Sequence, residues 1–238
     1  MTVPRSQIIS YDDTPFYHVI SRCVQHTFLC GIDPYTKKDY NHRKQWIEDR
    51  IRILSSLFSI EICSYAVMSS HYHIVLKALP DEGTAWSDRE VIKRWLSVYR
   101  GSNIERKFIN NEPIKPYEKD AVDSKIPIWR ERLKSISWFM KSLNEPLARE
   151  ANSEMGTEGN FWISRFKSYA LLDEEAVLTA MAYVDLNPVH AKMAKTPESS
   201  KNAWTHSSIY PAVLKPTVNM VDSQTTYSLQ INQSNYDH

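Results

Sequence analysis

The spacing of hydrophobic residues predicts the elements of the first eighty residues. Aromatic and β-branched residues from Phe16 to Cys23 predict a strand. From Tyr40 to Phe58 the apolar residues recur at helical spacing, which predicts an amphipathic helix. Two more apolar runs, Ile60–Val67 and Tyr72–Leu79, flank a short polar turn and predict a β-hairpin. The predicted order is therefore strand, helix, strand, strand.

The second half of the chain is less regular. A capping-box pattern at Ser87 predicts that a helix starts there. From Gly101 to Trp129, prolines and mixed charges break the periodicity, so we expect an extended insertion, with helix resuming from Arg130 to Ala151. Phe161–Leu172 predicts a strand or strand pair. The acidic turn 173–175 then predicts a last helix, which Pro188 should end.

These elements predict an α+β fold. We expect an antiparallel sheet of four or five strands, with helices packed largely on one side and a helical insertion at about 101–160. At 238 residues and 42% hydrophobic composition, the chain can bury one sizeable core, so residues 1–215 are predicted to form a single domain. Residues 216–238 are polar without a clear period, which is typical of a flexible C-terminal tail.

Composition narrows the cellular setting. No apolar run is long enough for a signal peptide or a membrane span, so we expect a cytoplasmic protein without membrane association. The three cysteines are too few for a disulfide framework and lack the paired spacing of a zinc site, so we interpret them as buried or partly buried thiols.

The middle of the chain is basic. The segment from Val91 to Lys141 holds twelve Lys or Arg against six Asp or Glu, an excess that suits a phosphate-rich partner. Arg94 and Arg100, with the aromatic rings of Trp95 and Tyr99, are candidate contacts to unpaired nucleic acid. The alternative is a solvated helical surface without a ligand.

Two histidines carry the first chemical signal. His71 and His73 are two residues apart, so on a strand they point to the same face and can share one ligand. The opposite face is strongly apolar, which favours an internal strand whose imidazoles look into a cleft. The alternative is two polar residues on the solvent face of an edge strand.

The last helix carries the second signal. Tyr183 and Asn187 are four residues apart and therefore neighbours on one helical face, with Asn187 just before Pro188, where its amide oxygen can turn toward a metal. Val177, Met181 and Val184 form the predicted core stripe of this helix, and Tyr183 stands beside it among small residues. The alternative is a tyrosine at the edge of the stripe and an asparagine that caps the helix.

Together the two signals predict metal-assisted attack by a tyrosine. A phenol has a pKa of about 10 and is therefore a poor nucleophile at neutral pH, so its attack on a phosphodiester needs help from a divalent cation. Two imidazoles and one amide oxygen leave coordination positions open for phosphate oxygens or water. Mixed nitrogen and oxygen donors favour Mn²⁺ or Mg²⁺ over a closed zinc site. No nucleotide cofactor is expected, since the phosphotyrosine conserves the bond energy.

Four segments in the same order resemble the REP-associated tyrosine transposases, a group of single-tyrosine HUH endonucleases: Tyr17–Arg22, Tyr65–His73, Phe161–Phe166 and Tyr183–Val189. The resemblance covers most of residues 14–209. It implies a ferredoxin-like or RRM-like sheet, the two histidines and Asn187 as metal ligands, and a 5′-phosphotyrosine on Tyr183 with release of a 3′-hydroxyl. It also implies palindromic repeat hairpins as the DNA partner.

The chain departs from the family pattern at two positions. Ser70 replaces an asparagine before the first histidine, and His190 replaces an arginine after the Asn-Pro-Val triplet. His190 is largely neutral at pH 7 and would be a weaker phosphate contact than arginine. We nevertheless expect His190 and Arg165, which lies in the third matching segment, to contact DNA.

The sequence thus predicts a metal-dependent endonuclease and strand transferase of single-stranded DNA. A monomer is favoured over a homodimer. Two other functions remain open at this point: a non-catalytic module that binds single-stranded nucleic acid, and a hydrolytic metal-dependent nuclease in which water attacks.

Overall fold

The computed structural model describes residues 8–25, 27–191, 193 and 203–205. Five strands form one sheet in the order β4-β1-β3-β2-β5, and every neighbouring pair in it is antiparallel. The strands are β1 (Phe16–Arg22), β2 (Ile60–Val67), β3 (His71–Ala78), β4 (Lys167–Ala170) and β5 (Ala203–Thr205). The fold is α+β, as the sequence predicts.

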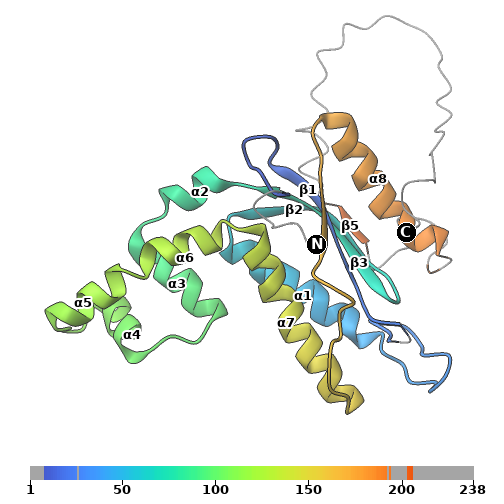
Figure 1. The fold of residues 1–238 in the computed structure, drawn as a ribbon, viewed down its shortest axis with the longest axis horizontal. Coiled ribbons are helices and arrows are strands. Elements are labelled where there is room, and N and C mark those ends of the chain that lie inside the picture. The colour runs from blue at the N-terminus through green and yellow to red at the C-terminus, as the bar shows by residue number, and fades with distance from the viewer. Residues whose placement is uncertain (1–7, 26, 192, 194–202, 206–238) are drawn as a thin grey trace, which may run out of the picture.

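Eight helices are described (Figure 1). They are α1 (His42–Leu57), α2 (Pro80–Ala85), α3 (Asp88–Val98), α4 (Asn103–Asn110), α5 (Pro116–Asp123), α6 (Ile126–Leu133), α7 (Ile136–Met155) and α8 (Glu174–His190). The path β1-α1-β2-β3-α7-β4, with the sheet order 4-1-3-2, is that of a ferredoxin-like unit. Helix α8 and strand β5 follow that unit.

Helices cover both faces of the sheet. The sequence pattern had predicted helices largely on one face, and that prediction was wrong. Helices α1 and α7 lie on one face and α8 lies on the other (Figure 1). The cause is the alternation of the central strands, which are apolar on both faces: Val75 of β3 packs under α8, while its neighbours Ile74 and Leu76 point to α1 and α7.

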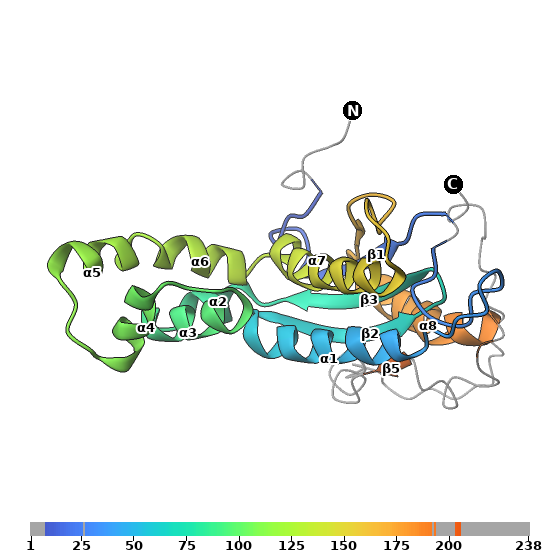
Figure 2. The same cartoon turned by 90° about the horizontal axis from the view of Figure 1, so that it is seen from below.

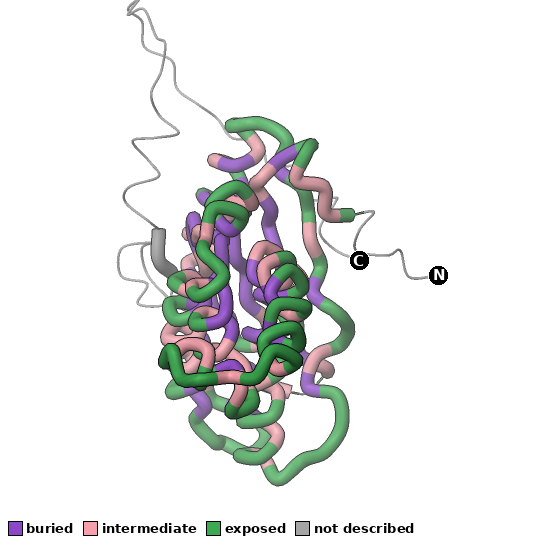
Figure 3. The backbone as a smooth tube through the Cα atoms, turned by 90° about the vertical axis from the view of Figure 1, so that its left-hand side faces the viewer, coloured by how far each residue is buried: buried purple, intermediate pink, exposed green. Residues whose placement is uncertain are grey.

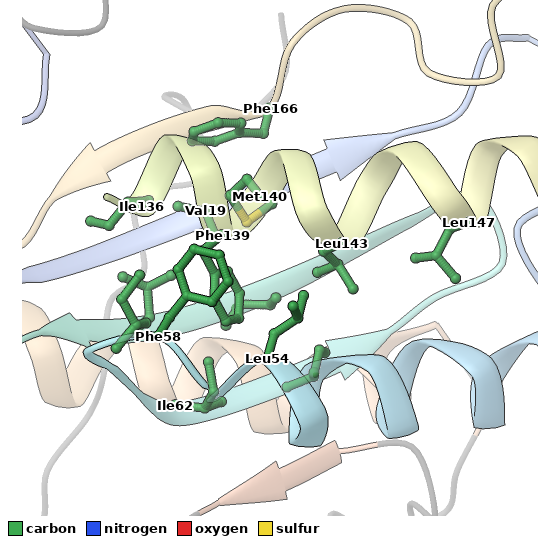
Figure 4. Close-up of a cluster of buried hydrophobic side chains, with 14 of the residues drawn as sticks. Val19, Leu54, Phe58, Ile62, Ile136, Phe139, Met140, Leu143, Leu147 and Phe166 are labelled. Carbon is green, nitrogen blue, oxygen red and sulfur yellow. The ribbon is translucent and has the colours of Figure 1, made fainter. Parts of the chain in front are cut away.

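The larger core lies between the sheet and the pair α1 and α7. Figure 4 shows Leu54 of α1, Phe139 of α7 and Val19 of β1 among the side chains of this core. The rings of Phe58 and Phe139 meet edge to face, with centroids 5.6 Å apart. Figure 3 shows that the central strands are buried along their length, so the sheet is a rigid base for the side chains on its other face.

Helices α2 to α6 form an arm that extends beyond the sheet (Figure 2). The prolines from 113 to 127 were expected to break the helical periodicity there. Pro113 does lie in the non-helical stretch 112–115, but the arm is helical on either side of it, as predicted for the insertion. Pro116 and Pro127 lie in the first turns of α5 and α6. A proline is accommodated in a first turn because its missing N–H has no partner in the helix there.

Three other boundaries differ from the predicted ones. The helix predicted over 130–151 is divided at Lys134–Ser135 into α6 and α7. Only Lys167–Ala170 of the segment 161–172 is a strand, joined by an isolated bridge between Cys23 and Trp162. Helix α8 passes Pro188 and ends at His190, with the Ala191 amide bonded to the Asn187 carbonyl.

Three further predictions from the sequence concern the cysteines, membrane-spanning segments and the C-terminal tail. Cys23, Cys30 and Cys63 are all free and buried, as predicted. Within the described part of the chain, none of the helices has both the length and the apolar character needed to cross a membrane. The polar tail predicted for 216–238 lies outside the described residues.

Candidate active site

The two histidines of β3 lie on the sheet face that α8 covers. In the register of the sheet His71 is opposite Arg22 and His73 is opposite Ile20, so all four side chains share this face. Tyr72, between the histidines, points into the opposite core and is fully buried. His73 is only 3% exposed, and His71 is half-buried. The two ring centroids are 4.9 Å apart.

A neighbouring side chain engages the Nδ1 atom of each histidine. The Ser70 hydroxyl lies 3.1 Å from His71 Nδ1, and His18 Nε2 lies 3.0 Å from His73 Nδ1. His73 Nε2 is buried and has no hydrogen-bond partner among the described residues. A nitrogen in that state fits a metal ion, because an unpartnered buried polar atom is costly unless it has a ligand.

The environment keeps these rings neutral. Burial lowers the pKa of His73 to about 2, with further lowering by His18, His71 and Arg22. Burial, followed by the charge of Arg22, lowers the pKa of His71 to about 4. Burial alone lowers the pKa of His18 to about 4. A neutral imidazole has the lone pair that a metal ion requires, so the rings are in the state that can bind one.

Helix α8 places Tyr183 above the histidines. The Asp173 side chain accepts a hydrogen bond from the Ala176 amide at 2.7 Å and so caps the first turn. Val177, Met181 and Val184 are buried against the sheet, as the predicted stripe requires. The ring of Tyr183 is half-buried and meets the ring of His73 edge-on, with centroids 5.6 Å apart.

Asn187 lies one turn after Tyr183, inside the helix rather than at its end. Its Nδ2 donates to the Tyr183 carbonyl oxygen at 2.9 Å. This bond places the amide nitrogen on the backbone, so Oδ1 is the atom that remains for a cation. Asn187 is half-buried and does not line the pocket that contains the histidines.

A pocket of about 440 Å³ brings the candidate groups together. It contains Tyr183, both histidines and three exposed cations on the surrounding strands and loop. The lining residues are Ile20, Arg22, His71, His73, Ile163, Ser164, Arg165, Lys167, Tyr169 and Tyr183. Of the predicted DNA contacts, Arg165 is therefore in this pocket.

Sequence reasoning assigned no role to four residues of this region, Arg22, Lys167, Tyr169 and His18. The alternation of β1 places His18 and Arg22 on the face of the histidines, and this was readable from the sequence once the pairing with β3 was known. Lys167 and Tyr169 come from β4, which pairs with β1. Only the pairing of β4 shows that they reach the pocket.

Comparisons with known proteins give one structural likeness. No protein-family model and no curated protein sequence matches the chain. The fold is similar to a solved structure of a REP-associated tyrosine transposase bound to a REP hairpin, with 11% sequence identity and a TM-score of 0.48. The alignment covers 96% of this chain and 100% of that chain. We infer the function of this chain from the side chains of its pocket.

The other predicted DNA contacts lie outside the pocket. Trp95 is 6% exposed, and its ring stacks on Tyr99 and Trp129 with centroids 4.3 and 5.7 Å away. It is part of the arm's core, so it offers no open ring face to a base, contrary to the expectation from sequence. The Tyr99 hydroxyl is 2.8 Å from the Ser142 hydroxyl.

The three remaining predicted DNA contacts, Arg94, Arg100 and His190, differ in their exposure and in their contacts. The guanidinium of Arg94 donates to the Ser56 carbonyl at 2.7 Å and lies over the Trp86 ring. It therefore caps the C-terminal end of α1. Arg100 is exposed just after α3, and His190 is exposed in the last turn of α8. Both are placed where a ligand can reach them, but neither lines the pocket.

Proposed function

We propose that this protein is a metal-dependent endonuclease and strand transferase of single-stranded DNA, with Tyr183 as its nucleophile. The observation that carries the proposal is the shared pocket of Tyr183, His71 and His73, whose rim holds Arg22, Arg165 and Lys167. A tyrosine, two neutral imidazoles and three cations are together what phosphoryl transfer to a phenol requires.

The histidines fit a divalent cation. His71 and His73 would hold it through their Nε2 atoms, since a hydroxyl and a second imidazole occupy their Nδ1 sides. Asn187 Oδ1 is our candidate for a third donor. When bound, Mn²⁺ or Mg²⁺ would act as a Lewis acid on a non-bridging phosphate oxygen. We propose no nucleotide cofactor, because a phosphotyrosine conserves the energy of the phosphodiester bond.

The reaction we propose is a transesterification. The Tyr183 oxygen attacks phosphorus, a P–O bond to Tyr183 forms, and the bond from phosphorus to the 3′-oxygen breaks. The phenol proton passes to water, and the leaving 3′-oxygen takes up a proton from water to become a hydroxyl. Attack by another 3′-hydroxyl on the phosphotyrosine reverses these steps and joins two strands. Arg22, Arg165 and Lys167 neutralise the phosphate charge as it approaches.

The shape of the pocket supports an unpaired strand as the substrate. The phosphate must enter a hollow of about 440 Å³ between the sheet and α8, beside the half-buried ring of Tyr183. A single strand can bend into such a hollow, whereas a duplex holds its phosphates on a stiff outer surface. Following the family resemblance, we propose hairpins of palindromic repeats as the DNA. We also propose a monomer as the acting unit.

Labelled oligonucleotides test the proposal. The substrates are single-stranded hairpins with randomised flanks, labelled at the 3′ end in one set and at the 5′ end in another, incubated with protein and Mn²⁺. A 5′-phosphotyrosine attaches the 3′-labelled fragment to the protein on a denaturing gel and releases the 5′-labelled fragment. We expect both products from wild type, neither from Tyr183→Phe, and neither after chelation.

The pocket holds a second tyrosine, which the experiment must address. Tyr169 is 42% exposed in the same pocket, so Tyr169→Phe is compared with Tyr183→Phe. Tyr117, which is 63% exposed on α5 of the arm, supplies the matched control variant Tyr117→Phe. An adduct that is lost in Tyr169→Phe and retained in Tyr183→Phe would contradict the proposed nucleophile. Free 5′-phosphate ends without any adduct would indicate a hydrolytic nuclease instead.

A further inference from the structure

His18 lies directly behind His73 and has no part in the proposed reaction. It comes from β1, where the register places His18 opposite Val75 and Ile20 opposite His73. The two imidazoles are therefore diagonal neighbours on one face of the sheet. Their rings are stacked with centroids 5.1 Å apart, and each residue is 3% exposed. A buried polar pair of this kind costs stability unless its hydrogen bonds are satisfied.

The contact between the two rings admits two arrangements of the proton. His18 Nε2 and His73 Nδ1 are 3.0 Å apart, and one of them must donate while the other accepts. If His18 donates, His73 carries its proton on Nε2, where a buried N–H would face no acceptor among the described residues. A buried donor without an acceptor costs about 1–3 kcal/mol.

In the other arrangement His73 donates from Nδ1 and His18 accepts on Nε2. The lone pair of His73 is then on Nε2, the atom that is buried and unpartnered in the pocket. A lone pair there can bind a cation, whereas an N–H cannot. Only this arrangement makes His73 a metal ligand through Nε2.

We infer that His18 is a positioning residue that fixes the tautomer and the direction of His73. The inference rests on the proposed function, because it concerns the cation that the pocket would hold. His18 accepts the Nδ1 proton of His73, as carboxylates and carbonyls do for histidines in other metal sites. Ser70 has the same place beside His71, with its hydroxyl 3.1 Å from Nδ1. Both ligand rings are thus held from behind.

The same geometry separates His18 from the ligands themselves. No group of three or more His, Cys, Asp or Glu side chains in the described part of the chain is arranged to hold a metal ion. The Nε2 of His18 is directed at His73 rather than at a shared centre. His18 therefore supports the site without completing it, and the third donor must be of another kind.

Substitutions at His18 test the inference through metal affinity rather than activity. His18→Leu introduces an apolar side chain of similar bulk and removes the Nε2 acceptor. His18→Gln keeps an amide oxygen near the position of Nε2. At constant pH, calorimetric titration with Mn²⁺ should give an affinity about 10- to 100-fold weaker for His18→Leu. His18→Gln should recover most of that loss, and thermal melting without metal checks that each variant is folded.

The nitrogen resonances of His73 give a second measurement that needs no metal. In wild type we expect the chemical shift of a protonated Nδ1 and an unprotonated Nε2, and in His18→Leu a loss of that single tautomer. Equal Mn²⁺ affinity in wild type and a folded His18→Leu would overturn the inference while leaving the metal site intact. A protonated Nε2 in wild type would overturn it as well. Absence of Mn²⁺ binding by wild type would instead overturn the proposed metal site, and the inference with it.

Discussion

Asn144 of α7 fixes the strand that carries the histidines from the opposite side of the sheet. Its Oδ1 accepts a hydrogen bond from the Tyr72 hydroxyl, and its Nδ2 donates to the Ser21 hydroxyl at 2.9 Å. Tyr72 is 0% exposed and lies between the two histidines, and Ser21 is 2% exposed in the neighbouring strand. One amide therefore ties α7 to both β1 and β3.

We predict that Asn144→Leu lowers the free energy of unfolding by about 2 kcal/mol. Leucine has nearly the same shape, so the substitution removes hydrogen bonds without opening a cavity. If Tyr72 and Ser21 both lost their partners, the cost would be about 2–6 kcal/mol, since each buried group left unpaired costs about 1–3. However, the Tyr72 hydroxyl is also within hydrogen-bond reach of Ser21. The two can bond to each other, which reduces the expected loss to about one unpaired group.

Urea denaturation, followed by circular dichroism, measures this loss. Tyr72→Phe and the double variant Tyr72→Phe/Asn144→Leu complete the comparison. In the double variant no buried tyrosine hydroxyl remains, so its destabilisation should be smaller than the sum of the two single losses. A loss below about 0.5 kcal/mol in Asn144→Leu, or strict additivity in the double variant, would refute the reasoning from buried unpaired groups.

Three further predictions concern the cation, the phosphate contacts and the arm. Mn²⁺ at about 100 times its dissociation constant should stabilise wild type by about 2.7 kcal/mol in thermal melts but leave His71→Ala unchanged, and chelation should reverse the effect. Arg165→Ala should weaken binding of single-stranded DNA and lower the slope of log K against log salt by about 0.7, measured by fluorescence anisotropy; an unchanged slope would remove Arg165 from the contacts. Burial would raise the pKa of Glu105, but hydrogen bonds from Lys125 and Ser102 outweigh it and hold the pKa at about 2, below the ordinary 4.5. Because this folded-state pKa is lowered, the bonds of Glu105 contribute about 3 kcal/mol above pH 4.5, and the stability advantage over Glu105→Gln should disappear as the pH falls toward 2.

The first half of the fold could be predicted from the sequence because its patterns are local and unambiguous. The run Ile60–Val67 and the hairpin to Leu79 differ from the observed strands by at most one residue. The alternation His71, Tyr72, His73 correctly placed both histidines on one face of the sheet and Tyr72 on the other. Side-chain direction in a strand follows from its two-residue period alone, so no tertiary information was needed there.

The remainder depended on tertiary contacts that one sequence does not display. The helical pattern around Trp95 does not reveal whether its ring faces solvent or the core. Only the packing of α3 against α6 shows that the ring is buried. The hydrogen bond between His18 and His73 joins residues 55 positions apart and depends on the strand register. Pro188 was expected to end α8, but the helix continues for two more residues, to His190, because only the bond to the Val184 carbonyl is lost.

The most direct test of the central claim is to locate the DNA on the protein. After reaction with a single-stranded hairpin and Mn²⁺, nuclease trimming leaves a short nucleotide on the attacked side chain, and tandem mass spectrometry of the peptides identifies that residue. We predict a nucleotide attached through its 5′-phosphate to Tyr183, the ring that lies 5.6 Å from His73. Attachment to Tyr169 or to any other residue, or cleaved DNA with no modified peptide, would contradict the account.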